Sequence, residues 1–203
     1  MVSSRVDNNE DGPTFLAMTT PGSFSSDIAA IRQRAREHLE QGALTPNYGG
    51  DVETTISLLN DAVATEIVCV LRYRYHAIAA AGLASDSVKA EFEEHAADEQ
   101  QHLLWIAERI NQLGGTPDMN PDGISERAHT QYVEGENLVD MIKENLVAER
   151  IAIETYRDMI RYFSDKDPTT RTLLEKVLAQ EEDHANDMHD LLVAHEGRGV
   201  LDH

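Results

Sequence analysis

The chain has 203 residues, 41% of them hydrophobic, and carries 37 acidic against 17 basic side chains. A chain of this size buries a substantial core and fits one domain more naturally than two. Its net charge of -20 repels phosphate backbones and argues against a nucleic-acid partner, whereas it suits cations or simply a well-solvated surface.

The sequence also argues against a membrane partner and against secretion. Charges soon interrupt apolar runs such as that from Ile67 to Leu71, so no stretch approaches the roughly 20 apolar residues of a membrane helix. The N-terminus lacks the order of a signal peptide, and the single Cys69 cannot form an intrachain disulfide. We therefore predict a cytoplasmic protein.

The first quarter of the chain is predicted to lie outside the main fold. Residues 1–25 have no apolar periodicity and read as a flexible tail, in which Met18 is an alternative start to Met1. Residues 26–50 are predicted to hold a short helix, at about 26–41, and a linker. Such a helix is suited to docking on the rest of the chain or on a neighbouring subunit.

Four long amphipathic segments follow, and their ends carry helix signals. Asp51 opens the first segment, Gly82 ends it, and Gly114 ends the second. Pro168 lies in the first turn of the fourth. No strand pattern intervenes, so we predict an all-α fold. The predicted helices span about 51–81, 85–113, 137–162 and 167–195.

The connections between these helices predict a ferritin-like four-helix bundle over residues 51–195, followed by a C-terminal tail at 196–203. Short turns near Gly82 and Asp165 make two hairpins, and the long connection at 114–136 joins them. This is the connectivity of a bundle with one crossover. Fully extended, the connection exceeds the roughly 42 Å length of a 28-residue helix, so it can return along the bundle.

One set of side chains occurs twice in the predicted bundle. Each copy has a glutamate, a tyrosine seven residues later, and a Glu-x-x-His motif whose glutamate lies 32 or 33 residues after the first. The copies are Glu66, Tyr73, Glu99 and His102 in the first half and Glu149, Tyr156, Glu181 and His184 in the second. A single Glu-x-x-His is common on acidic helices, whereas two matched copies are far more specific.

The spacing predicts that the glutamates meet. Residues equally far from the turn of an antiparallel hairpin lie at one height, and the midpoints of the two glutamate pairs fall at the two turns, Gly82 and Asp165. Each glutamate is then roughly 24 Å from its turn. Four carboxylates among apolar neighbours repel one another unless cations lie between them. Two divalent ions balance the four charges, and oxygen plus imidazole ligands suit iron or manganese.

At these residues the sequence resembles the ferritin-like di-iron carboxylate proteins, over about residues 51–195. It is similar to bacterioferritin and to the Dps-like mini-ferritins with a bacterioferritin-type centre, in the stretch from Leu58 to Glu66 and in that from Gln180 to His184. The resemblance implies two irons per subunit. It also implies that the terminal ligands are Glu66, His102, Glu149 and His184. The bridging carboxylates are then those of Glu99 and Glu181.

Two departures from bacterioferritin refine this expectation. Gln100 occupies the position of the methionine that ligates haem in that group, so haem is not expected. The chain ends soon after the fourth helix, without a fifth, which favours a homo-oligomeric shell of twelve subunits over one of twenty-four. The single Cys69 cannot supply the cysteine pair that some Dps-like proteins carry near their centre.

Other residues near the motifs have two readings each. Tyr73 is either a tyrosine that hydrogen-bonds to the centre or donates electrons to it, or a half-buried structural residue, and Tyr156 is read rather as structural. Cys69 is read as a small core residue rather than a redox partner. His95, four residues before Glu99, is read as a core or pore-lining histidine rather than a third imidazole ligand.

The resulting hypothesis is a ferroxidase that oxidises Fe(II) with O2 or H2O2, for iron storage and protection from oxidative stress in an oligomeric shell. The alternative is a di-metal redox enzyme without storage, such as a manganese catalase-like protein, a peroxidase or a hydroxylase. A structural zinc site is a third reading. The sequence names neither the oxidant, nor the metal loaded in the cell, nor the route of iron entry.

Overall fold

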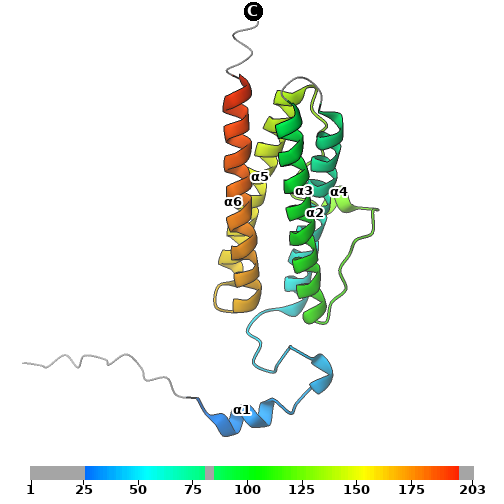
Figure 1. The fold of residues 1–203 in the computed structure, drawn as a ribbon. Helices are drawn as coiled ribbons and strands as arrows, with labels where there is room; N and C mark the ends of the chain where they lie inside the picture. The colour runs from blue at the N-terminus through cyan, green and yellow to red at the C-terminus, as the bar shows by residue number, and fades with distance from the viewer. Residues whose placement is uncertain (1–25, 81–84, 197–203) are drawn as a thin grey trace, which may run out of the picture.

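The computed structural model describes residues 26–80 and 85–196, and every regular element in these ranges is helical (Figure 1). This confirms the all-α prediction. The predicted tail at 1–25, the turn at Gly82 and residues 197–203 of the tail predicted at 196–203 lie outside the described residues, whereas Glu196 ends α6. The elements are α1 (Ile28–Arg34), the 3-10 helix η1 (Leu39–Gln41), α2 (Val52–Ala79), α3 (Ser85–Gln112), α4 (Ile124–Arg127), α5 (Leu138–Phe163) and α6 (Pro168–Glu196).

The four long helices begin and end within two residues of the predicted positions, because local caps set their ends. The Asp51 carboxylate accepts a hydrogen bond from the Thr54 amide at 2.8 Å and caps α2. Asn137 caps α5 in the same way. At the end of α3, Gly114 takes a positive φ of 76°, a conformation that glycine adopts without strain.

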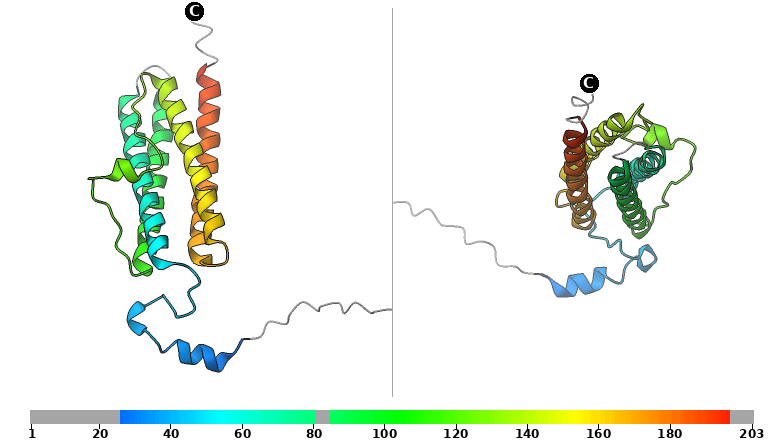
Figure 2. Two further views of the ribbon diagram at one scale, coloured as in Figure 1. Left: turned by 180° about the vertical axis from the view of Figure 1, so that it is seen from behind. Right: turned by 45° about the horizontal axis from the view of Figure 1, so that its top comes forward.

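The long helices form two antiparallel hairpins packed side by side (Figures 1 and 2). In Figure 1, α2 and α6 run upward whereas α3 and α5 run downward. The crossover therefore travels the length of the bundle, from the lower end of α3 to the upper end of α5. The predicted four-helix bundle with one long crossover is confirmed.

The crossover is fastened to one face of α2 by polar contacts that the sequence did not predict. Four α2 residues on this face, spaced by three or four positions, each contact a residue of the stretch 129–134. The pairs are Thr65 with His129, Cys69 with Thr130, Arg72 with the Gln131 carbonyl, and His76 with the Val133 and Glu134 carbonyls.

The short helix α4 was not predicted within the crossover. Its Ile124 is buried and packs against Ala64 and Val68 of α2. One buried apolar residue and the polar contacts of the following stretch therefore hold the crossover against the bundle.

The predicted helix at 26–41 is wrong in its extent. The chain forms only α1 and η1 there, separated by His38 at a left-handed φ of 53°. No residue of either element is buried, and Ile28 and Leu39 are 52% and 74% exposed. Short helices are marginal without tertiary packing, and this segment lies below the bundle rather than on it (Figure 1).

The membrane expectation needs one correction. By length and composition alone α2 is apolar enough to cross a membrane, with a mean hydropathy of 1.4 in its most apolar 18-residue window. Half of that window is buried inside the protein, and the helix carries the fully buried Arg72. We therefore describe α2 as the core helix of the bundle.

Besides the small cluster around Ile124, the apolar core has two large clusters, and the four glutamates and two histidines of the motifs lie between these two on all four helices. One cluster includes Val63, Ile106, Ala152 and Val177, and the other includes Tyr73, Ala96, Ile142 and Met188. Each helix therefore contributes apolar residues on both sides of its motif. The core thus supplies a dry, packed environment at mid-bundle for polar groups.

Candidate metal centre

The structure brings all six motif residues together at mid-bundle, and none is more than 4% exposed. Their ligand atoms form two groups within which all atoms lie within 4.8 Å of one another. Both groups share Glu99 and Glu181. The groups are Glu66, Glu99, His102 and Glu181, and Glu99, Glu149, Glu181 and His184.

The two imidazoles face the carboxylates through their Nδ1 atoms. His102 Nδ1 lies 3.1 Å from both Glu99 Oε2 and Glu181 Oε1, and 3.7 Å from Glu66 Oε2. His184 Nδ1 lies 3.5 Å from Glu181 Oε2 and 3.7 Å from Glu99 Oε1. The four helices therefore deliver two nitrogens and four carboxylates to one place.

The outer nitrogen of each imidazole meets an oxygen from the other hairpin. His102 Nε2 lies 3.2 Å from Gln180 Oε1, and His184 Nε2 lies 3.4 Å from Asp98 Oδ2. An Nε2–H donor to these oxygens leaves the Nδ1 lone pairs directed at the centre. Sequence reasoning missed Asp98 and Gln180, although each directly precedes a motif glutamate and so occupies the same place in the repeat.

The two tyrosines are also paired across the halves of the chain. The Tyr73 hydroxyl on α2 donates a hydrogen bond to Glu149 Oε1 on α5. The Tyr156 hydroxyl on α5 donates to Glu66 Oε1 on α2. Both tyrosines are buried, so the reading of Tyr156 as merely structural missed its contact with the centre. Each hydroxyl holds one carboxylate oxygen and leaves the other facing inward.

The inward-facing atoms fit bound metal ions. Among the described residues, six buried ligand atoms of the centre have no hydrogen-bond partner. Leaving so many buried acceptors unpaired is costly, and a coordinated cation satisfies them together. The atoms are Glu66 Oε2, Glu99 Oε1, Glu149 Oε2, Glu181 Oε1 and Oε2, and His184 Nδ1.

The metal-free centre favours protons on Glu66, Glu149 and both imidazoles. Burial, then the charge of Glu99, raises the pKa of Glu66 and Glu149 well above the ordinary range. Burial alone would lower the pKa of His184, but the carboxylates of Glu181 and Glu99, 3.5 and 3.7 Å from its Nδ1, outweigh burial and raise the pKa to about 11. Burial likewise opposes the charged form of His102, but the nearby carboxylates of Glu181, Glu66 and Glu99 raise its pKa. The electrostatics therefore favour positive charge in the centre.

His95 lies beside the centre. Its ring stacks on His184 with centroids 4.1 Å apart, and its Nδ1 lies 3.1 Å from the Tyr73 hydroxyl. Burial, then the charge of His184, lowers its pKa to about 3, so the ring is neutral. A ring nitrogen of His95 lies within 4.8 Å of ligand atoms of Glu149 and His184, and its Nε2 lies near Glu91 and Asp187.

Cys69 and Gln100 lie in contrasting environments. Cys69 is buried, with its Sγ 3.5 Å from Thr130 Oγ1 and 3.7 Å from an Arg72 nitrogen. Burial raises the pKa of this thiol well above its usual value, which disfavours the reactive thiolate. Gln100 is exposed on α3, and the expectation that haem is absent stays a prediction.

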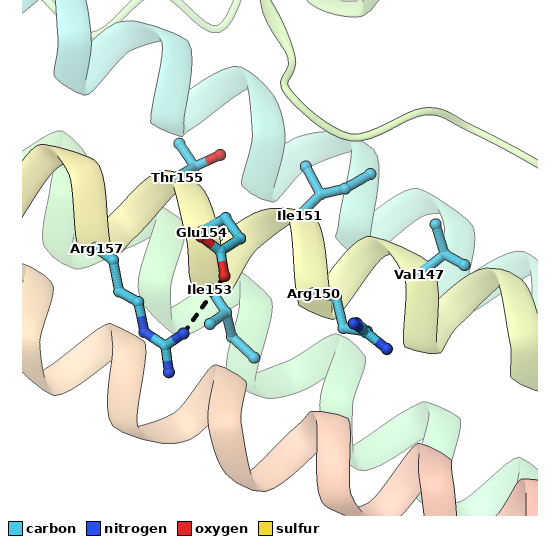
Figure 3. A pocket seen from close by; sticks show the side chains of 7 residues that line it. All are labelled: Val147, Arg150, Ile151, Ile153, Glu154, Thr155 and Arg157. Atoms are coloured by element: carbon cyan, nitrogen blue, oxygen red, sulfur yellow. Dashed lines mark hydrogen bonds and ion pairs between the residues drawn. The ribbon is translucent and has the colours of Figure 1, made fainter.

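A polar cavity of about 180 Å³ between α3 and α6 reaches the centre at His184. Five carboxylates, two imidazoles and one amide line it. A larger cavity of about 640 Å³ lies on α5 alone, where Glu154 and Arg157 form an ion pair (Figure 3). Its lining contributes none of the grouped ligand atoms, so the smaller cavity is the one relevant to the centre.

A model of a known protein family matches most of this chain. The model described as "Ferritin-like domain" matches residues 56–196. The chain is 28% identical over 152 residues to the "DNA protection during starvation protein" of Pyrococcus furiosus, covering 73% of this chain and 82% of that one.

Solved structures agree in fold. The dodecameric thioferritin of Bacteroides fragilis, described as bacterioferritin-related, has a TM-score of 0.72 and 31% identity, over 76% of this chain and 93% of that one. A ferritin-like di-iron-carboxylate protein of Bacillus anthracis has a TM-score of 0.62 and 27% identity, over 70% of this chain and 96% of that one.

Proposed function

The chain belongs to the ferritin-like family, and on that premise we propose that it is a ferroxidase that oxidises Fe(II) at the centre described above. The observation that carries the proposal is the set of buried ligand atoms without hydrogen-bond partners. One imidazole and three carboxylates in each group suit Fe(II), while Mn(II) and Zn(II) accept the same ligands.

The residues that the two groups share indicate which ligands bridge the irons and which bind one iron each. Glu99 and Glu181 belong to both groups. They would therefore bridge the two substrate irons. The terminal ligands are Glu66 and His102 for one iron and Glu149 and His184 for the other. Tyr73 and Tyr156 orient the two terminal glutamates by holding one oxygen of each.

A pair of irons matches the electron count of both candidate oxidants. Two Fe(II) ions give up one electron each. These two electrons and two protons reduce O2 to H2O2, or reduce H2O2 to two molecules of water. The product is two Fe(III) in either case. Displaced protons of the carboxyls and imidazoles are a local source for this reduction.

We further propose that the Fe(III) is stored inside a homo-oligomeric shell in the cytoplasm, with protection from oxidative stress as its consequence. The related structure from Bacteroides fragilis is described as dodecameric, and twelve subunits are the assembly expected here. Nucleic acid is not an expected partner, although the Pyrococcus furiosus relative is named for DNA protection. The net charge of -20 supports this expectation.

Aerobic addition of Fe(II) to metal-free protein tests the oxidation, followed by the near-ultraviolet absorbance of Fe(III). We expect oxidation to be much faster than in buffer, and Glu149→Gln to remove most of the acceleration. Glu154→Gln, which changes an exposed side chain of the same helix, is the matched control. A wild-type rate equal to that in buffer would refute the proposal. Oxygen release from H2O2 by the manganese-loaded protein would instead favour a catalase-like enzyme.

A further inference from the structure

A further group of candidate ligand atoms contains none of the six residues of the centre. It consists of Glu91 and His95, one turn apart on α3, and Asp187 on α6. His95 Nε2 lies 3.4 Å from Glu91 Oε1 and 3.5 Å from Asp187 Oδ2. Two ligands bound to one metal at about 2.1 Å with a tetrahedral angle lie about 3.4 Å apart, so these spacings fit coordination.

The hydrogen bonds of His95 determine which nitrogen carries its proton. The Tyr73 hydroxyl has one proton, which it donates to Glu149. The 3.1 Å contact between His95 Nδ1 and that hydroxyl is therefore a bond that Nδ1–H donates. In this tautomer the lone pair of the ring lies on Nε2.

This lone pair faces two carboxylates, so three acceptors converge with no proton between them. The His95 side chain is 2% exposed, whereas Glu91 and Asp187 are 33% and 49% exposed. A nearly buried nitrogen aimed at two carboxylates without a donor is unfavourable unless a cation lies between the three. The group is thus more than a patch of surface acids.

The position of the group connects solvent with the centre. All three residues line the cavity of about 180 Å³, which also exposes His184. This volume accommodates an ion with several of its waters, since a water occupies about 30 Å³ of liquid. The remaining carboxylates of the lining attract cations to the same place.

We propose that Glu91, His95 and Asp187 bind a third divalent metal ion, separate from the pair at the centre. One nitrogen and two carboxylate oxygens are suitable for Fe(II), and Co(II) or Zn(II) substitute for it in a binding experiment. The assignment of Fe(II) rests on the proposed ferroxidase function, whereas the binding of the cation does not. The ion would lie in the same cavity as His184, which is a ligand of the centre.

Anaerobic titration of metal-free protein with Co(II), in salt that suppresses weak surface binding, tests the proposal by stoichiometry. We expect three ions per chain for the wild type and two for the double variant Glu91→Gln, Asp187→Asn. The matched control is Glu94→Gln, Asp183→Asn, which removes the same charge from the same cavity but leaves the three ligands, and it should retain three.

The outcomes separate this site from the centre. Three ions in the Glu91→Gln, Asp187→Asn protein, or only two in the wild type, would overturn the third site. Loss of an ion in the control variant would also overturn it, because general acidity would then explain the binding. If the centre failed and the third site stood, the wild type would bind one ion, and only the first double variant would lose it. Anomalous scattering from a Co(II)-loaded crystal locates each ion.

Discussion

At the residue scale, each half of the chain orients the ligands contributed by the other. Tyr156 holds Glu66 and Gln180 holds His102, while Tyr73 holds Glu149 and Asp98 holds His184. Such outer contacts fix the rotamer and tautomer of a ligand, and so orient its coordinating atom toward the metal. The outer residues of each copy of the repeat therefore contact the metal ligands of the other copy.

Tyr156→Phe tests this crossed support. Removing the hydroxyl frees Glu66 Oε1, so the carboxylate no longer presents a single fixed oxygen to the metal. We expect Co(II) affinity at the centre to fall about 10- to 100-fold, the usual effect of losing an outer partner. Calorimetric titration measures it. Tyr162→Phe, on the surface side of the same helix, should bind like the wild type, and equal affinities in all three proteins would contradict the prediction.

The protonation of the metal-free centre predicts a pH dependence of metal binding. The pKa of His184, raised to about 11, means that its imidazole holds a proton at neutral pH, and the raised pKa values of Glu66 and Glu149 shift their deprotonation to higher pH. A bound metal requires the deprotonated ligands, so uptake releases protons. Since the pKa of His184 is about 11, we expect the apparent affinity to keep rising with pH above neutrality, toward that value.

Calorimetry in two buffers with different ionisation enthalpies counts the released protons. The observed heat should differ between the buffers, because each buffer takes up the protons with its own enthalpy. Identical heats, or an affinity that falls as the pH rises, would contradict the prediction.

At the element scale, a buried ion pair ties both hairpins to the segment before α2. Arg109 of α3 donates to both oxygens of Asp167, at 3.0 and 3.1 Å, and to Thr170 Oγ1 at 2.8 Å. Asp167 also caps α6 and accepts a hydrogen bond from the Tyr48 hydroxyl at 2.8 Å. One carboxylate therefore fixes the relative position of three segments.

Asp167→Ala should be strongly destabilising, since it leaves the Arg109 guanidinium buried without its partner. We expect a loss of about 3 to 5 kcal/mol in the free energy of unfolding, as for one partner of a buried pair. Asp165→Ala in the same turn, where the side chain is exposed, should change it by less than about 0.5 kcal/mol. Denaturant unfolding of the metal-free proteins compares the two, and similar losses would refute the assignment.

The crossover has its own anchoring on α2, which neither its composition nor its length predicted. The buried Arg72 donates to the Gln131 carbonyl at 3.2 Å and to Asn145 Oδ1 of α5 at 2.8 Å. Its guanidinium therefore joins α2, the crossover and the helix that carries Glu149. Two histidines take part in the same contact: His129 Nδ1 lies 2.9 Å from Thr65 Oγ1, and His76 Nε2 lies 3.0 Å from the Val133 carbonyl.

At the scale of the whole molecule, the proposed storage function requires a closed assembly. Twelve chains of 22.6 kDa give a mass of about 270 kDa. We expect light scattering coupled to gel filtration to report this mass. Twice that value would indicate a shell of twenty-four subunits, and a monomer or dimer would exclude storage in a shell.

The charge of the whole molecule predicts its behaviour toward DNA. With a net charge of -20 we expect no retardation of duplex DNA in a gel at physiological salt. Positive charge in the described N-terminal segment is concentrated at Arg32, Arg34 and Arg36. Retardation by the wild type that is lost on changing these three arginines to glutamine would contradict the prediction and locate the contact.

The sequence by itself determined the four long helices, their ends and the level at which the motifs meet. Helix periodicity, caps and turn midpoints are local quantities, so they can be read along the chain. This is why six separated residues could be assigned to one centre. The same reasoning failed for residues 26–41, because a helical pattern without a packing partner does not secure a long helix.

Only the tertiary structure decided which side chains pair across helices. The sequence did not say which glutamate each tyrosine contacts; the packed helices direct Tyr73 to Glu149 and Tyr156 to Glu66. They also turn His95 Nε2 toward Glu91 and Asp187. Such contacts depend on the rotation and height of one helix against another, which the packing of both apolar clusters sets and no single helix encodes.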